Sequence, residues 1–115
     1  VMSRHDEKIF DALLRIPAAP FTNYKEVAKA IGSSPRAVGQ ALKRNPRPVQ
    51  VPCHRVVCSD FTLGGYWGLL NDDRKRALLL DEGIIIDGNR IINTEKMFYF
   101  YHLHYVHAYT HIKAP

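Results

Sequence analysis

The fold is decided by residues 23–42, which read NYKEVAKAIGSSPRAVGQAL. Asn23 begins a variant of the capping box, which starts a helix, and Gly32 is a typical helix end. Ser33 or Ser34 then caps a second helix after a very short turn. The stretch therefore predicts two helices in a helix-turn-helix arrangement.

The second of these helices has almost no side-chain bulk on part of its surface. In DNA-binding proteins the second helix of such a pair enters a groove, although many helical domains contain the same pair only as structure. The small residues Ala37, Gly39 and Ala41 would let the backbone approach another surface closely. Because Gly39 destabilises the helix, its presence favours a functional role for this surface. Arg36 lies in the first turn of this helix, and Lys43, Arg44 and Arg47 follow at its end as predicted contacts to DNA phosphates.

Further elements extend on both sides of this pair. Ser3 is expected to cap an N-terminal helix that stops before Pro17. Residues 84–92 contain Asp-Gly between two apolar runs, which is typical of a β-hairpin. The fold class predicted for residues 1–115 is a single, mainly α, winged-helix-like domain with a helix-turn-helix and a small C-terminal β-hairpin.

Between the helix pair and the hairpin lies a loop rich in glycine and aromatic residues, over residues 59–68. A further helix is predicted to begin near Asp72 or Asp73 and to end at Gly83. The glycines permit tight turns, and exposed backbone amides there would be able to line a pocket.

Composition narrows the functional classes. The formal net charge is +5 and the pI is about 9.4, which favours an acidic partner such as nucleic acid, with a solvated basic surface as the alternative. No apolar run approaches the roughly 18 residues of a membrane span, and no signal peptide is apparent. We therefore expect an intracellular monomer with no membrane contact, in the cytoplasm at the nucleoid or, in a eukaryote, in the nucleus.

Two patterns raise the question of a metal site. Cys53 and Cys58 form no disulfide framework, and their spacing lacks the companion ligands of a zinc site. In the tail over residues 97–115, His104, His107 and His111 would share one face of a helix. No acidic or thiol ligand joins them, and an aromatic packing segment explains the composition equally well. The sequence predicts neither a metal nor a cofactor.

The segment at residues 49–57 reads VQVPCHRVV and places Cys53 in an apolar run beside His54. Cysteine often fills a core as a small hydrophobe. Here the imidazole offers a base, while Arg55 and the basic segment 43–47 are expected to make the surroundings electropositive, which favours thiolate. The segment therefore predicts a nucleophile.

The run Pro52-Cys53-His54-Arg55-Val56, with Asn45-Pro46 and Ser34-Pro35-Arg36-Ala37-Val38-Gly39 upstream, resembles the catalytic domain of O6-alkylguanine-DNA alkyltransferases. The resemblance covers roughly residues 9–83. It implies a methylated-DNA–protein-cysteine methyltransferase that acts once. Such a protein flips an O6-alkylguanine out of double-stranded DNA and transfers the alkyl group irreversibly to its own cysteine.

The resemblance also implies roles for particular residues. Cys53 would attack the alkyl carbon as thiolate, and His54 would take the thiol proton through a water. Glu82 would hold the imidazole in the productive tautomer, and Asn45 would brace the turn that carries the cysteine. The spacing between Tyr66 and Glu82 is about two residues longer than the common family pattern, so Glu82 has a second interpretation as a surface charge.

For DNA, the resemblance implies that Arg36 fills the place of the flipped nucleotide. Tyr24 would press on the 3′ phosphate and donate to guanine N3, or it is simply a core tyrosine. The small residues of the second helix would lie in the minor groove. Trp67 departs from the family pattern, and it would either close off the pocket and restrict it to methyl groups or turn outward. The residues expected around the base are Pro48, Val56, Tyr66, Trp67 and Gly68.

Two other classes remain open. A winged helix-turn-helix regulator would use the same helices, take residues 84–92 as its wing and treat Cys53 as packing. A non-catalytic sensor of alkyl lesions would bind damaged DNA without repairing it, but proteins of that sort lack the reactive cysteine. Cys53 therefore argues against the sensor.

Overall fold

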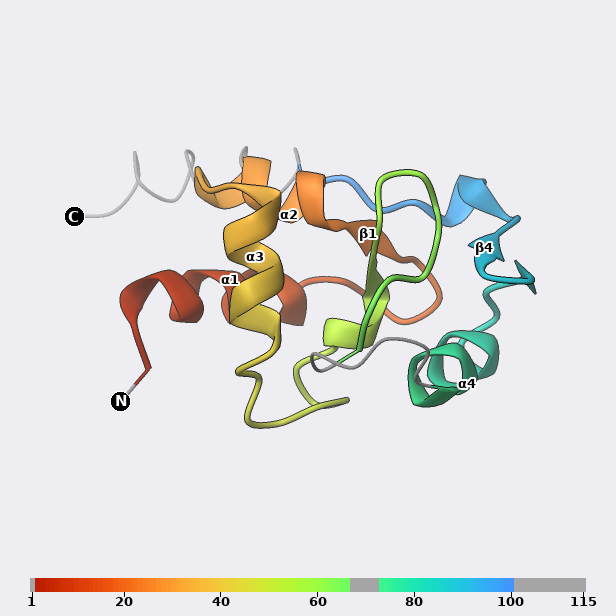
Figure 1. Cartoon of the computed structure of the whole chain (residues 1–115), viewed down its shortest axis with the longest axis horizontal. Coiled ribbons are helices and arrows are strands. Elements are labelled where there is room, and N and C mark those ends of the chain that lie inside the picture. The colour runs from red at the N-terminus through yellow and green to blue at the C-terminus, as the bar shows by residue number, and fades with distance from the viewer. Residues whose placement is uncertain (1, 67–72, 101–115) are drawn as a thin grey trace.

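The computed structural model describes residues 2–66 and 73–100, in which four α-helices dominate (Figure 1). Trp67, Gly68 and the predicted histidine face of the tail lie outside the described residues. The helices are α1 (Arg4–Leu14), α2 (Tyr24–Ile31), α3 (Pro35–Leu42) and α4 (Asp73–Asp81). The strands are β1 (Thr22–Asn23), β2 (Val56–Val57), β3 (Ile86–Asp87) and β4 (Arg90–Ile91), with short 3-10 helices at Cys53–Arg55 and Thr94–Lys96.

The helix-turn-helix prediction is confirmed by the capping contacts. Asn23 Oδ1 accepts the backbone N–H of Glu26 at 2.8 Å, which starts α2. Gly32 ends that helix with a φ of 71°, in the left-handed region that favours glycine. Ser34 Oγ accepts the N–H of Ala37 at 3.1 Å and begins α3. The turn is short because Gly32, which ends α2, lies only two residues before Ser34, which caps α3.

Two apolar clusters divide the molecule, and Figure 1 shows the same division, with α1, α2 and α3 in one half and α4 with the β3–β4 hairpin in the other. The first cluster packs the helix-turn-helix against α1 and includes Cys53 and Val56. The second packs Val57 and Leu79 against the hairpin. Strand β2 therefore passes from one cluster to the other.

A short parallel pairing between β1 and β2 brings the two halves together, with Thr22 opposite Val56 and Asn23 opposite Val57. A third segment closes it, because Phe21 accepts the N–H of Phe98 at 2.6 Å. The pairing places the start of α2 beside the end of β2, while the turn that carries Cys53 leads into the beginning of the same strand. It is this arrangement, rather than either helix alone, that positions the candidate site.

The predicted hairpin is confirmed as the antiparallel pair β3–β4, with Asp87 opposite Arg90. Its assignment as a wing stays a prediction. Among the described residues, none of the helices has both the length and the apolar character that crossing a membrane requires.

Candidate active site and DNA-facing helix

Cys53 opens a single turn of 3-10 helix and is almost fully buried, with 3% of its surface exposed. Its backbone N–H donates to the Val51 carbonyl at 2.7 Å. Asn45 holds the same loop from the other side, since its Nδ2 donates to that carbonyl at 2.9 Å and its Oδ1 accepts the N–H of Arg47 at 2.9 Å. The side chain that ends the α3 segment thus fixes the loop that leads to the thiol.

A hydrogen-bonded network joins the side chains of His54, Arg55 and Glu82, the first two of which directly follow Cys53 in the chain. His54 is fully buried, and its Nε2 lies 3.0 Å from Glu82 Oε2. Arg55 donates to the same carboxylate twice, from Nε at 2.8 Å and from Nη2 at 2.6 Å. Arg55 also donates from Nη1 to the Ile16 carbonyl at 2.8 Å, which ties the network to the end of α1.

This network determines which ring nitrogen of His54 is available as a base. The carboxylate of Glu82 accepts a hydrogen bond from Nε2–H, so Nδ1 is the unprotonated nitrogen of the neutral ring. Nδ1 is buried and has no hydrogen-bond partner among the described residues. Burial lowers the pKa of His54 and outweighs the opposing effect of Glu82. The resting imidazole is neutral and can accept a proton.

Glu82 remains ionised in this environment. Burial alone would raise the pKa of its carboxyl, but the hydrogen bonds from Arg55 and His54 outweigh burial and hold the pKa below its ordinary value. The longer spacing from Tyr66 therefore does not displace Glu82 from the imidazole.

The electrostatics around the thiol differ from the sequence prediction. Burial raises the pKa of Cys53, and the hydrogen bond from Asn45 and the charge of Lys75 only partly offset this effect. The prediction that Arg55 favours thiolate is wrong, because its guanidinium is directed to Glu82 and to the Ile16 carbonyl. The resting cysteine is a protonated thiol that needs a base.

Sequence reasoning missed Lys75, whose side chain is only 1% exposed although it lies on α4. Its Nζ donates to the Val56 carbonyl at 2.7 Å and to the Gly65 carbonyl at 3.0 Å. It also lies 5.8 Å from the centroid of the Tyr24 ring. Burial lowers the pKa of Lys75 to about 8. The only sequence signal was a lysine in the charged first turn of this helix, which normally indicates a solvated face.

Tyr24 stands at the first position of α2, half-buried beside this lysine. A Cβ added to Gly64 would lie 3.7 Å from the Tyr24 hydroxyl oxygen, so the glycine loop passes close to the phenol. Burial, followed by the nearby cysteines, raises the pKa of Tyr24 to about 12. The phenol is therefore a hydrogen-bond donor at neutral pH.

The other residues expected around a base differ in how much of their surface is exposed. Pro48 is half-buried on the loop before Cys53, whereas Tyr66 is buried under Arg74, whose guanidinium carbon lies 5.6 Å from the ring centroid. Val56 is fully buried in the core, and its carbonyl accepts a hydrogen bond from Lys75 Nζ. The side chain of Val56 is thus a core contact.

On α3 the structure separates the predicted DNA-facing residues. Arg36 is exposed, and Ala37 and Gly39 are half-exposed. A Cβ added to Gly39 would meet only the Tyr24 ring, at an ordinary 4.0 Å, so packing in the free protein does not require glycine there. The prediction that Ala41 faces DNA is wrong, because Ala41 is fully buried in the core.

The two arginines that follow α3 also differ. Arg47 is exposed, as expected of a side chain that contacts phosphate. Arg44 instead forms a two-pronged ion pair with Asp6 of α1, with Nε 2.9 Å from Oδ2 and Nη2 3.0 Å from Oδ1. No local pattern predicts this pairing, because the two residues lie on segments far apart in the chain.

The buried, neutral His54 makes the stability of the fold depend on pH. Its pKa in the folded protein lies below the ordinary 6.5, so the unfolded chain binds a proton first as the pH falls. We expect the free energy of unfolding to decrease as the pH falls through 6.5, by about 1.4 kcal/mol for each unit of pKa difference. Denaturant titrations between pH 8 and pH 5 measure this, and His54→Gln should flatten the dependence. Stability that rises on acidification over that range would contradict it.

The geometry defines a class of protein: a helix-turn-helix domain in which a buried cysteine is followed in the chain by a neutral imidazole that a carboxylate orients. Residues 4–84 match the family described as 6-O-methylguanine DNA methyltransferase, DNA binding domain. Because this match spans more than half of the chain, the protein belongs to that family.

Individual relatives agree with the family. The chain is 52% identical over 73 residues to the methylated-DNA–protein-cysteine methyltransferase of Pyrobaculum aerophilum, which covers 64% of this chain and 48% of the relative. It is 43% identical over 86 residues to the protein of the same name from Archaeoglobus fulgidus, covering 71% and 58%. The chain thus spans about half the length of the curated relatives it matches.

Two solved structures are also similar. The O6-methylguanine-DNA methyltransferase of Pyrococcus kodakaraensis is 39% identical with a TM-score of 0.66, over 72% of this chain and 48% of that one. Schizosaccharomyces pombe Atl1, solved with damaged DNA that contains O6-carboxymethylguanine, is 30% identical with a TM-score of 0.75. That comparison covers 85% of this chain and 97% of Atl1.

Proposed function

We propose that this protein repairs O6-alkylguanine in double-stranded DNA by transferring the alkyl group irreversibly to Cys53. The observation that supports this most directly is that the buried Cys53 is followed in the chain by a buried His54, whose Nε2 is held by Glu82 and whose Nδ1 has no partner among the described residues. A site of this kind creates thiolate only when a proton can pass to His54.

The transfer balances within this set of groups. The thiol proton passes to His54, the sulfur forms a bond to the alkyl carbon, and the bond between that carbon and guanine O6 breaks. The electron pair of the broken bond stays on the guanine, which takes up a proton and is restored. The product is a thioether on Cys53, and the side chains described around it have no means to hydrolyse it, so each protein acts once.

Tyr24 and α3 would handle the DNA. A phenol that stays protonated at neutral pH is suited to donate to guanine N3, which makes the purine a better leaving group. Exposed Arg36 at the start of α3 would occupy the place of the flipped nucleotide. Ala37 and Gly39 would let α3 lie in the minor groove, where base readout is degenerate, which suits repair at any sequence. The hairpin would act as the wing of a winged helix-turn-helix.

The similarity to Atl1 in complex with damaged DNA favours a second candidate, a sensor that binds alkylated guanine without repairing it. Both functions require lesion binding, and they differ only in whether Cys53 becomes alkylated. The presence of Cys53 beside a neutral His54 supports transfer.

The deciding experiment is intact-protein mass spectrometry after incubation with duplex DNA that contains one O6-methylguanine. We expect the wild-type protein to gain the mass of one CH2 group, mapped to Cys53 by peptide analysis, and Cys53→Ala to gain nothing. Cys58→Ala is the matched control and should react like the wild type. Unchanged mass with tight lesion binding would favour the sensor, and unchanged mass without lesion preference would favour a regulator.

A further inference from the structure

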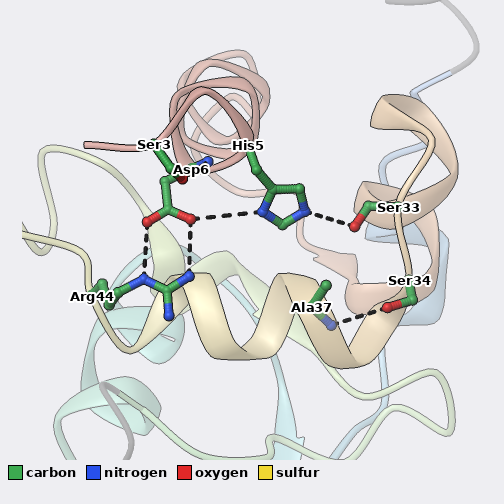
Figure 2. Close-up of polar contacts among 7 residues, drawn as sticks. All are labelled: Ser3, His5, Asp6, Ser33, Ser34, Ala37 and Arg44. Carbon is green, nitrogen blue, oxygen red and sulfur yellow. Dashed lines mark hydrogen bonds and ion pairs between the residues drawn. The ribbon is translucent and has the colours of Figure 1, made fainter. Parts of the chain in front are cut away.

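The first turn of α1 contacts the segments that flank α3 at each of its ends, as Figure 2 shows. At the C-terminal end, the Asp6 carboxylate is paired with Arg44 through two hydrogen bonds of 2.9 and 3.0 Å. The Asp6 side chain is only 8% exposed. Arg44 belongs to the turn that ends α3, because its backbone N–H donates to the Ala41 carbonyl at 2.9 Å.

At the other end, His5 reaches the turn between α2 and α3. Its Nε2 lies 2.7 Å from Ser33 Oγ, and the next residue, Ser34, caps α3 (Figure 2). His5 Nδ1 also lies 3.7 Å from Asp6 Oδ1, so the two contacts share one carboxylate. Ser3 fixes the turn itself, because its Oγ accepts the N–H of Asp6 at 3.1 Å.

Helix α3 needs such external support. It has eight residues and a glycine near its middle, and helices of this length are marginal without tertiary contacts. Its position also affects the reactive segment, because Arg44 precedes Asn45, the residue that braces the loop before Cys53. A shift of the end of α3 would therefore move both the DNA-facing surface and that loop.

If Arg44 served only to bind phosphate, a carboxylate such as that of Asp6 would not be expected to pair with it. A carboxylate on this surface repels DNA, and it occupies two donors of an arginine that would otherwise bind the backbone. We propose that residues 3–6 form a clamp that positions α3 for DNA, in which Asp6 and Arg44 act through the helix and contact no DNA themselves. This inference rests on the proposed function as far as DNA binding is concerned.

The two roles of Arg44 predict opposite signs for Asp6→Asn. We would measure the dissociation constant for a fluorescent duplex with one O6-methylguanine in a Cys53→Ala background, below the unfolding temperature of every variant. The matched control is Asp11→Asn, which removes the same charge from an exposed position of the same helix. A clamp predicts that Asp6→Asn weakens binding about fivefold, while Asp11→Asn binds as the parent does or slightly more tightly. Equal or tighter binding by Asp6→Asn would overturn the clamp.

Salt dependence supplies an independent readout. If Arg44 only positions α3, Arg44→Gln and the Asp6→Asn/Arg44→Gln double variant should weaken binding to a similar extent. For both variants, the slope of the logarithm of the binding constant against the logarithm of the salt concentration should equal that of the parent. If Arg44 contacts a phosphate, Arg44→Gln should reduce the slope by about one and weaken binding in the Asp6→Asn background as well. That result would contradict the clamp.

Two further measurements keep the outcomes separable. Ser33→Ala removes the contact at the other end without changing charge and should weaken binding in the same direction, so the clamp can be tested even if Asp6→Asn does not fold. In the Cys53-containing protein, transfer from free O6-methylguanine base does not need the DNA-facing surface, so Asp6→Asn should lower the rate of that transfer by a smaller factor than it lowers the affinity for lesion DNA. Failure of the parent to bind lesion DNA or to react would instead contradict the proposed function.

Discussion

Replacing Glu82 with alanine should destabilise the fold and nearly abolish transfer. The substitution removes the acceptor shared by His54 Nε2 and by Nε and Nη2 of Arg55, and it leaves a guanidinium that is 15% exposed without its carboxylate. Losing one partner of such a pair costs about 3 kcal/mol of unfolding free energy. Without an orienting acceptor on Nε2, the tautomer that leaves Nδ1 free is no longer favoured, and the transfer rate should fall by about 100-fold.

The measurements are urea unfolding and the single-exponential rate of methyl transfer from an O6-methylguanine duplex. Asp81→Ala is the matched control, since it removes the same charge from the adjacent exposed position; it should change stability by at most about 0.5 kcal/mol. Equal stability and equal rates for Glu82→Ala and Asp81→Ala would restore the interpretation of Glu82 as a surface charge.

Lys75→Met should produce the second large effect, on both stability and thiol reactivity. It leaves the carbonyls of Val56 and Gly65 without their donor in a buried region. We expect a loss of about 2–4 kcal/mol, since each unsatisfied group costs about 1–3 kcal/mol and the relief of burying an ammonium offsets part of that. It also removes a positive charge that lowers the pKa of Cys53, so that pKa should rise further.

Alkylation of Cys53 by iodoacetamide as a function of pH reports the thiol directly. In Lys75→Met the midpoint of the rate profile should move to higher pH, and the rate at neutral pH should fall. Arg76→Met removes the same charge from the neighbouring position of α4 and serves as the control. A profile unchanged in Lys75→Met would show that the lysine only supports packing.

Local signals in the sequence predicted the helices well. The side chains of Ser3, Asn23 and Ser34 cap helices in the structure, and Gly32 adopts the left-handed conformation that a helix end favours. These features depend on residues within one turn of each other. The hairpin is also local, but its two turn residues are Gly88 and Asn89 rather than the predicted Asp-Gly, because Asp87 ends β3 and pairs with Arg90.

Features that depend on tertiary contacts could not be predicted in this way. The burial of Lys75 follows from two carbonyls on other segments, and the pairing of Arg44 follows from the position of α1. Ala41 belongs to the small residues of α3, but the helix rotates it into the core. Charge near Cys53 in sequence also gave the wrong direction for its pKa, because Arg55 is directed away to Glu82.

The burial of Cys53 has a consequence for the lifetime of the unused protein. Dissolved electrophiles and oxidants react with thiolates much faster than with thiols, and burial keeps this sulfur protonated and 3% exposed. A protein that is consumed by one reaction would be lost to every stray alkylating agent if its sulfur were permanently activated. Under the proposed function, burial of the thiol therefore protects Cys53 from dissolved alkylating agents, so that its single reaction is with alkylated guanine in DNA.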